Sequence, residues 1–522
     1  AALKAGRRAG CDFLDPAGRL VAGGAAPRLT SLDDVPSPWL DGMLDRFFPL
    51  RFTPLLEFSR GCPYSCNYCN TGDSYFDKVR LLSDERALAD LDYIAQRAER
   101  HGIAQLVLCD SNFGLLPRDV ELARRMAELG ARHGWPVNVL ATSAKNAKKR
   151  VIEIADVLGR SMVSFMSVQS MDDGVLANIR RANISLADFE AVARQMARSH
   201  HPQTCEFIAP LPGETFAGFV TGLRKILDSE VDSVVCHTLQ ANYGTAYRDD
   251  PAFRQEHGFV VKHRLVPLDF SRLDGETVFD IEQVVVATRD LAFEDYVRLR
   301  SLVFVVDQAF NMPYVRPLRR LIAERGAKVS DLVMLAFETL DALPAAARAV
   351  LESFVAETRS ELWDDEAALI FDLTRDYDAV VAGERGGNVL FRHRVLMLAG
   401  PLTEWLDHLF GCAARVLGER AAPGQLDDVR AYCLGLGGGL LDAARPDHVT
   451  RLGHDVVAWM DAPDATLDDH RRQHGVAVEF FLPPSERQAL LDGLDRYGGD
   501  VNGLVKLMQR LSRIIVRAAR HA

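Results

Sequence analysis

The chain contains 522 residues, 48% of them hydrophobic and 25% charged, which is typical of a globular protein and excludes wholesale disorder. Its length predicts about two or three domains. The net charge of -11 argues against nucleic acid and anionic membrane as partners, because both bind basic surfaces. With no uninterrupted apolar stretch of membrane-spanning length and no signal peptide at its start, the sequence predicts a cytoplasmic protein.

Short apolar runs alternate with amphipathic helical patterns between residues 51 and 270. Strands are predicted at 54–61, 104–110, 136–142, 161–170, 204–211 and 231–239. Helical segments separate them, among them 84–102 and 117–134. The strands are apolar nearly throughout, as in a parallel sheet covered by helices. The alternation predicts an α/β fold, for which we favour a partial (β/α)6 barrel over a doubly wound open sheet, although periodicity alone does not separate the two.

The patterns on either side of this region differ from it. Residues 1–50 are punctuated by proline and glycine and are predicted to form a linker segment. Residues 51–285 are predicted to form the barrel domain. Apolar residues recur with helical periodicity through residues 286–522, up to and including the final stretch 501–522, and predict a mostly helical C-terminal domain. The sequence does not reveal the function of that domain.

The stretch RGCPYSCNYCN places Cys62, Cys66 and Cys69 at the spacing C-x3-C-x2-C. The chain has nine cysteines and the other six are isolated, which argues against a disulfide framework. A closed zinc site needs four ligands, and no second pair of ligands lies nearby. A redox C-x-x-C motif leaves Cys62 unexplained. An iron–sulfur cluster with three cysteine ligands and one open iron accounts for all three thiols.

This cysteine loop, placed after the first strand of an α/β barrel, resembles the radical S-adenosylmethionine (SAM) superfamily, and Tyr68 before the last cysteine also matches. The resemblance implies a [4Fe-4S] cluster held by Cys62, Cys66 and Cys69, with SAM on the open iron. It further implies a barrel of the radical SAM type, cleavage of SAM to a 5′-deoxyadenosyl radical, and an electron donor such as flavodoxin or ferredoxin.

Other segments match the positions at which this family binds SAM. The resemblance implies the cofactor-binding residues Tyr68, Asp110, Ser111, Asn112, Gln169, Ser170, Arg181, Glu206 and Ile208. Residues 110–112 would meet the methionine amino group, 169–170 the ribose, Arg181 the methionine carboxylate, and 206–208 the adenine. Residues 110–112 also have a structural interpretation as a strand-end turn, and Arg181 as a surface arginine of a helix; Arg180 is an equal contender for Arg181. Glu214 is interpreted as an acid in the first turn of a helix.

Residues 31–48 are similar to the junction in cobalamin-dependent radical SAM enzymes, where a cobalamin-binding domain precedes the barrel. A domain needs ~50–200 residues, more than the linker offers, so the resemblance implies that such a domain lies upstream of Ala1. The expected function is a cobalamin-dependent methyltransferase acting on a small-molecule or peptide substrate. The alternatives are a cobalamin-independent radical SAM enzyme, catalysing methylthiolation or rearrangement, and a non-catalytic zinc-binding protein. The sequence identifies no catalytic acid or base.

Overall fold

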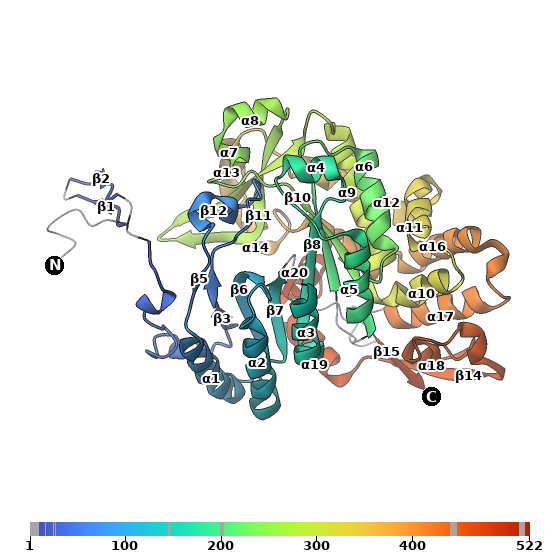
Figure 1. The fold of residues 1–522 in the computed structure, drawn as a ribbon. Coiled ribbons are helices and arrows are strands. Elements are labelled where there is room, and N and C mark those ends of the chain that lie inside the picture. The colour runs from blue at the N-terminus through green and yellow to red at the C-terminus, as the bar shows by residue number, and fades with distance from the viewer. Residues whose placement is uncertain are drawn as a thin grey trace. The chain divides into compact units, whose positions relative to one another are not determined.

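The computed structural model describes residues 10–144, 148–198, 203–438, 446–510 and 517–522, except for residues 16, 25 and 27. The chain divides into two compact units. The first contains Ala1–Pro63 and Ser74–Ser164, and the second contains Tyr64–Asp73 and Phe165–Ala522. Strands and helices alternate along the blue-to-green part of the chain in Figure 1. The predicted domain bounds stay a prediction.

The first unit is built on parallel strands covered by amphipathic helices. Its strands are β1 (Phe13–Leu14), β2 (Leu20–Val21), β3 (Leu55–Leu56), β4 (Ser59–Arg60), β5 (Arg80–Leu81), β6 (Gln105–Phe113) and β7 (Asn138–Ser143). Its helices are α1 (Asp84–His101), α2 (Asp119–His133) and α3 (Lys148–Leu158). Strand β6 pairs in parallel with β3 on one side and with β7 on the other. The pairing of β6 with β7 shifts register between Leu108 and Phe113, which bends the strand where its polar residues begin.

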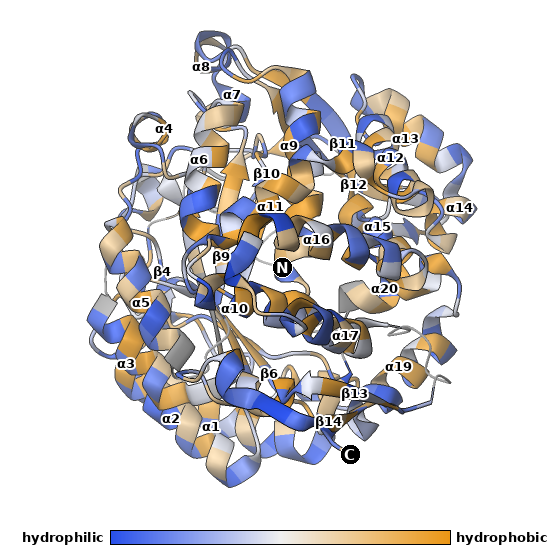
Figure 2. Ribbon diagram, turned by 90° about the vertical axis from the view of Figure 1, so that its right-hand side faces the viewer, coloured by the Kyte–Doolittle hydropathy of each residue, from blue (hydrophilic) through white to orange (hydrophobic). Residues whose placement is uncertain are grey.

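Local signals place the ends of helix α1. Ser83 is its N-cap and accepts a hydrogen bond from the backbone N–H of Arg86. Gly102 ends the helix in the left-handed conformation, at φ 63°. Leu91 and Ile94 lie on its fully buried face. In Figure 2 the ribbons of α1 and α2 alternate between hydrophobic and hydrophilic colours, as expected of helices with one buried face.

Besides the loop segment Tyr64–Asp73, the second unit contains the end of β8 and continues the β–α alternation. Its first elements are β8 (Met162–Gln169), α4 (Asp173–Asn178), α5 (Leu186–Arg198), β9 (Gln203–Ala209), α6 (Phe216–Leu227), β10 (Ser233–Thr238), α7 (Ala246–Asp249), α8 (Pro251–Glu256), β11 (Val260–Leu273) and β12 (Glu276–Ala287). Strands β9 and β10 are parallel, with Ile208 opposite His237. Along β9, Cys205, Phe207 and Ala209 are buried, whereas Glu206 and Ile208 share the other, less buried face.

The remainder of the second unit is mostly helical. Its helices are α9 (Phe293–Val306), α10 (Arg316–Glu324), α11 (Val329–Glu338), α12 (Ala345–Ser360), α13 (Glu366–Arg375), α14 (Tyr377–Ala382), α15 (Val389–Ala399), α16 (Leu402–Leu417), α17 (Gln425–Gly437), α18 (Val456–Asp461), α19 (Pro484–Tyr497) and α20 (Val501–Arg510). Its strands are β13 (His448–His454), β14 (Arg471–Phe481) and β15 (Ala518–His521). The expected α/β class with a mostly helical C-terminal region is confirmed. The prediction that 501–522 is helical throughout is wrong, because β15 pairs with β14. Residues 511–516 lie outside the described residues.

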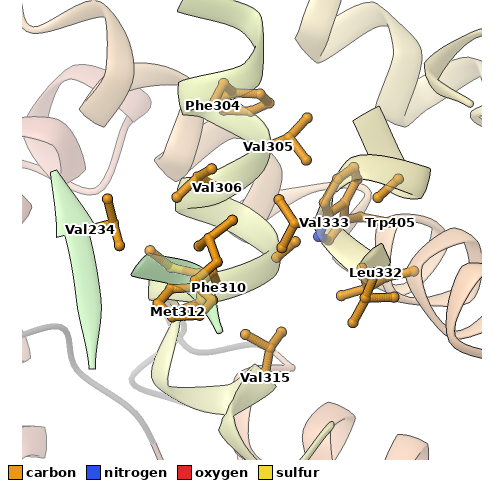
Figure 3. Packing of buried hydrophobic residues seen from close by; sticks show 14 of the residues in the cluster. Val234, Phe304, Val305, Val306, Phe310, Met312, Val315, Leu332, Val333 and Trp405 are labelled. Carbon is orange, nitrogen blue, oxygen red and sulfur yellow. The ribbon is translucent and has the colours of Figure 1, made fainter. Parts of the chain in front are cut away.

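A large apolar core joins β10 to the helical part of the second unit. Phe304, Phe310 and Trp405 are almost fully buried in it, and Figure 3 shows them among the surrounding aliphatic side chains. The side chain of Asn311 bonds both the N–H and the carbonyl of Val234, each at 2.8 Å. This contact and the core hold β10, and with it the exposed His237, in a fixed position. No helix among the described residues is long and apolar enough to cross a membrane.

Candidate functional site

The cysteine loop begins at a glycine that no other residue could replace without strain. Gly61 has φ 115°, and a Cβ atom there would lie 2.7 Å from the carbonyl oxygen of Lys78. The next residue, Cys62, is buried and its backbone N–H donates to the carbonyl of Phe76 over 2.9 Å. The backbone on this side of the loop is therefore held against residues 76–78.

The tip of the loop, in the second unit, is a tight turn with two cysteines. The N–H of Cys69 donates to the carbonyl of Cys66 (3.2 Å), and the N–H of Gly72 donates to the carbonyl of Cys69 (2.9 Å). A Cβ atom on Gly72 would lie 2.0 Å from the oxygen of Cys66, so only glycine fits. Cys66 is buried and Cys69 is half-buried. The described chain contains no disulfide.

The loop tip is tied to the segment that follows α4. The side chain of Asn67 donates to the carbonyl of Asn178 (2.9 Å), and its backbone N–H donates to Ile179 (3.3 Å). The hydroxyl of Tyr247 donates to the Asn67 side-chain oxygen over 3.0 Å. Asn67, which lies between the two cysteines, thus fixes the tip of the loop by bonds of its own side chain and backbone.

In the first unit, Asp110 has a defined structural task. Its carboxylate accepts hydrogen bonds from the backbone N–H of Phe58 (3.0 Å) and from the hydroxyl of Ser59 (2.6 Å). Burial raises the pKa of Asp110 to about 6, although these two hydrogen bonds lower it. Asp110 therefore links β6 to the chain that leads into the cysteine loop. Its predicted contact with SAM stays a prediction.

Asn112 faces the first cysteine directly. Its side-chain N–H donates to the sulfur of Cys62 over 3.2 Å. Its side-chain oxygen is buried and accepts no hydrogen bond from the described residues. Such an unpaired buried acceptor is costly unless a ligand supplies a donor. Ser111, beside it, is half-buried.

In the second unit, Arg181 is the centre of a polar network. It is 7% exposed and donates to the hydroxyl of Tyr68 (3.0 Å), to the side-chain oxygen of Asn183 (2.8 Å) and to the carbonyl of Ser167. These three acceptors are neutral, and the guanidinium also interacts with the nearby carboxylate of Glu206, whose pKa it helps to lower. Burial raises the pKa of Tyr68. The neighbouring Arg180 is exposed, which favours Arg181 of the two contenders.

The end of β8 holds a strained polar turn. Gln169 adopts φ 65°, and its side-chain oxygen is buried without a donor from the described chain. The hydroxyl of Ser170 donates to the carboxyl of Glu214 over 2.9 Å. Burial raises the pKa of Glu214 to about 7, and the nearby charge of Asp172 adds to the effect. The interpretation of Glu214 as a first-turn acid is wrong, because Thr215 is the N-cap of α6 and Glu214 precedes it.

Glu206 belongs to a three-residue cluster on strands β8, β9 and β10. It accepts a hydrogen bond from the hydroxyl of Ser167, and its other oxygen lies 3.3 Å from Nε2 of His237. Burial acts to raise the pKa of Glu206, but the hydrogen bonds from His237 and Ser167, together with the charges of His237 and Arg181, keep the pKa below its usual value. Ile208, one step along β9, packs with Tyr68 against a common apolar cluster.

Three residues of this network were not predicted from the sequence: Ser167, Asn183 and His237. His237 is the most informative of them, because its side chain is 54% exposed and paired with a carboxylate. It lies near the carboxyl end of the predicted strand 231–239, and a titratable residue at that end of a parallel strand is the signal that could have identified it.

Among the described residues, no group of three or more histidine, cysteine, aspartate or glutamate side chains could hold a metal ion. The chemistry of the donors nevertheless fits an iron–sulfur cluster and SAM. Three thiols lie in one glycine-bounded loop, Asn112 and Gln169 carry unpaired buried acceptors, and Arg181 is a buried cation with neutral partners. The ligand roles of the cysteines and the predicted cofactor-binding residues stay predictions.

Comparison with known proteins assigns this part of the chain to a class. The family model of the Radical SAM superfamily matches residues 56–225, which contain all three cysteines and every predicted cofactor-binding residue. Residues 56–225 therefore belong to the radical SAM superfamily. The resemblance inferred from the cysteine loop and the predicted barrel type are confirmed.

Named relatives carry the comparison further. The chain is 37% identical over 221 residues to the cobalamin-dependent radical SAM methyltransferase TokK of Streptomyces tokunonensis, covering 40% of this chain and 31% of TokK. It is 36% identical over 221 residues to 2-(S-pantetheinyl)-carbapenam-3-carboxylate methyltransferase of Streptantibioticus cattleyicolor, with 40% and 31% covered. These relatives confirm the resemblance to cobalamin-dependent radical SAM enzymes. The chain spans only 31% of the length of either relative.

Among solved structures, the chain is similar to the cobalamin-dependent S-adenosylmethionine radical enzyme OxsB with aqua-cobalamin and S-adenosylmethionine bound. The two share 13% sequence identity with a TM-score of 0.43. The similarity covers 82% of this chain and 64% of OxsB.

Proposed function

We propose that the chain is the radical SAM part of a cobalamin-dependent methyltransferase. The observation that carries the proposal is the C-x3-C-x2-C loop within residues 56–225, the segment that matches the superfamily. The names of the two methyltransferase relatives support the reaction class. The substrate would be a small molecule or a peptide, and the methyl group would go to an unactivated carbon or phosphorus atom.

Cys62, Cys66 and Cys69 would hold the [4Fe-4S] cluster, and the open iron would take SAM. When bound, the cluster supplies the electron that cleaves the carbon–sulfur bond of SAM to give a 5′-deoxyadenosyl radical. Burial of Cys62 and Cys66 would limit the access of water and oxygen to the sulfur atoms. The N–H that Asn112 directs at Cys62 would stabilise the thiolate charge.

The chain's own side chains offer complementary partners for each part of SAM. Arg181, whose acceptors are neutral, would bind the methionine carboxylate. The unpaired oxygen of Asn112 would accept from the methionine amino group. Glu206 is charged at neutral pH and would accept from hydroxyl or amino groups of the adenosine, while Ile208 offers an apolar contact. These roles orient the cofactor and require no proton transfer by the protein.

Cobalamin would be held by a separate cobalamin-binding domain, and the electron donor would be flavodoxin or ferredoxin. Cluster thiolates and a one-electron reductant both require a reducing compartment, so we place the protein in the cytoplasm. The chain would have no nucleic acid or membrane partner, in keeping with its acidic composition.

The test is anaerobic purification of the full-length protein, followed by iron and sulfide analysis and by assay of SAM cleavage with dithionite. We expect about four iron and four sulfide per chain and reductant-dependent 5′-deoxyadenosine. Cys66→Ala should abolish both, whereas Cys11→Ala, an exposed cysteine outside the loop, should change neither. Stoichiometric zinc without cleavage would instead support a zinc-binding protein. Cleavage that consumes no methylcobalamin would support a cobalamin-independent enzyme.

A further inference from the structure

A cluster of basic side chains lies on the first unit, beside the start of the cysteine loop. Arg28, Arg60, Lys78 and Arg80 surround a shallow depression of about 100 Å³ that also contains Tyr75. We call these five residues the basic patch. Arg28 and Lys78 are exposed, as are 56% of the Arg60 side chain and 55% of Tyr75.

The basic patch is held in place by contacts within the first unit. The guanidinium of Arg28 lies 4.3 Å from the centre of the Tyr75 ring. Nε of Arg80 donates to the carbonyl of Leu29 over 3.1 Å, and Arg60 pairs with Arg80 across the antiparallel strands β4 and β5. The four cations therefore stay close together although their charges repel, which is a cost that a binding role would explain.

The carboxylates near the basic patch do not neutralise it. Glu57 forms an ion pair with Arg60 at 2.5 Å, and Asp77 precedes Lys78 in the sequence. Among the described residues, Arg28, Lys78 and Arg80 form no ion pair with a carboxylate, so the patch keeps a local positive charge, whereas the whole chain carries a net charge of -11. The basic patch is thus a local positive surface on a chain whose net charge is negative.

The same backbone that carries the basic patch carries the first cysteine. Arg60 is two residues before Cys62, and Gly61 between them lines the depression. The backbone N–H of Cys62 donates to the carbonyl of Phe76, which lies between Tyr75 and Lys78 in the chain. A partner seated on the patch would therefore lie next to a residue that we expect to hold the cluster.

We propose that the basic patch is the docking surface for an acidic one-electron carrier protein that reduces the cluster. The inference rests on the proposed function, since only a cluster that must be reduced needs such a partner. Complementary charge would speed the encounter and set its orientation. The exposed Tyr75 ring supplies an apolar contact among the charged side chains, as aromatic residues do in protein interfaces.

The test compares a protein reductant with a small one, using the full-length, cluster-loaded protein. The double variant Arg28→Glu/Lys78→Glu reverses two exposed charges of the basic patch. The control is Arg100→Glu, which reverses an exposed charge on α1, outside the patch. With reduced flavodoxin, we expect the double variant to form 5′-deoxyadenosine about tenfold more slowly, or with a KM for flavodoxin about tenfold higher. With dithionite, both variants should cleave SAM at the wild-type rate. Wild-type turnover with flavodoxin should fall as salt is added, and this dependence should weaken in the double variant.

Direct binding of flavodoxin, measured by biolayer interferometry at low and high salt, separates docking from turnover. The proposal is supported if the double variant binds flavodoxin about tenfold more weakly than the wild type and the control variant binds it as the wild type does. Equal turnover and equal affinity in all three proteins would overturn it. An equal loss with dithionite would also overturn it, because the patch would then serve the cluster or an upstream domain. If the wild-type protein fails to cleave SAM both with flavodoxin and with dithionite, the proposed function itself is refuted.

Discussion

The buried carboxyl of Glu214 makes the stability of the second unit depend on pH. Its pKa lies near 7 in the folded chain, against an ordinary value of 4.5, chiefly because burial disfavours the charged form. The folded carboxyl therefore holds its proton more tightly than the unfolded one, and unfolding releases a proton between about pH 4.5 and 7. The free energy of unfolding falls as the pH rises through this window, and the stabilisation is fully present only below it.

The size of the effect follows from the displacement of the pKa. A change from 4.5 to about 7 corresponds to about 3 kcal/mol between the two ends of the window. Glu214→Gln keeps an oxygen that can accept from Ser170 and removes the charge. At about pH 8 we expect the variant to unfold about 1–3 kcal/mol less readily than the wild type, the lower end applying if the new amide N–H groups find no acceptor.

The measurement is urea-induced unfolding of wild type and Glu214→Gln at about pH 5 and pH 8, followed by circular dichroism. The variant should lose the part of the pH dependence that Glu214 causes. Glu256→Gln, which removes an exposed carboxylate from α8, is the matched control and should behave as the wild type does. If the wild type and Glu214→Gln respond equally to pH, the buried carboxyl is not protonated in the folded chain and the argument fails.

Three further predictions concern the cysteine loop and its neighbours. Gly72→Ala should bind less than half of the wild-type iron and sulfide on reconstitution, because its Cβ would collide with the oxygen of Cys66; unchanged iron content would contradict this. Arg181→Met should weaken SAM binding to the loaded protein about 10- to 100-fold by calorimetry, the loss of a charged hydrogen bond. Ser59→Ala should cost about 1 kcal/mol of stability in thermal unfolding, because it removes one of two donors to Asp110.

The elements that the sequence predicts well are those with local causes. Helix α1 begins at a serine cap and ends at a glycine, both legible in the sequence. The first predicted strand, 54–61, is instead divided into β3 and β4. The cause is not local: the N–H of Phe58 bonds the side chain of Asp110, which lies 52 positions further along the chain. The same limit explains the missed strand β15. Its residues pair with a distant part of the chain, since Ala518 lies opposite Phe481 of β14.

The candidate site shows the same division between local and distant causes. Its cysteines were predicted from the C-x3-C-x2-C motif, and Tyr68 and Arg181 from the resemblance of their segments to the family. The hydrogen bonds that these residues form in the folded chain could not be predicted from the sequence. Ser167 reaches Glu206 only because β8 and β9 are neighbours, and Glu214 is buried against Ser170 rather than exposed on a helix. Burial and pKa are consequences of packing, so sequence pattern alone assigned Glu214 the wrong environment.

The polar groups of the second unit, taken together, specify the ligand that the site suits. Arg181 is a buried cation whose hydrogen-bond acceptors are neutral, so a ligand carboxylate would improve its balance of charge. Gln169 offers a buried acceptor, and Glu206 is an anion that hydroxyl or amino groups could approach. A ligand with a carboxylate and several N–H or O–H donors meets these demands, whereas a zinc ion, itself a cation, would offer nothing to Arg181. SAM has these groups, and the side-chain chemistry therefore favours a cofactor-binding barrel over a structural metal site independently of the cysteine motif.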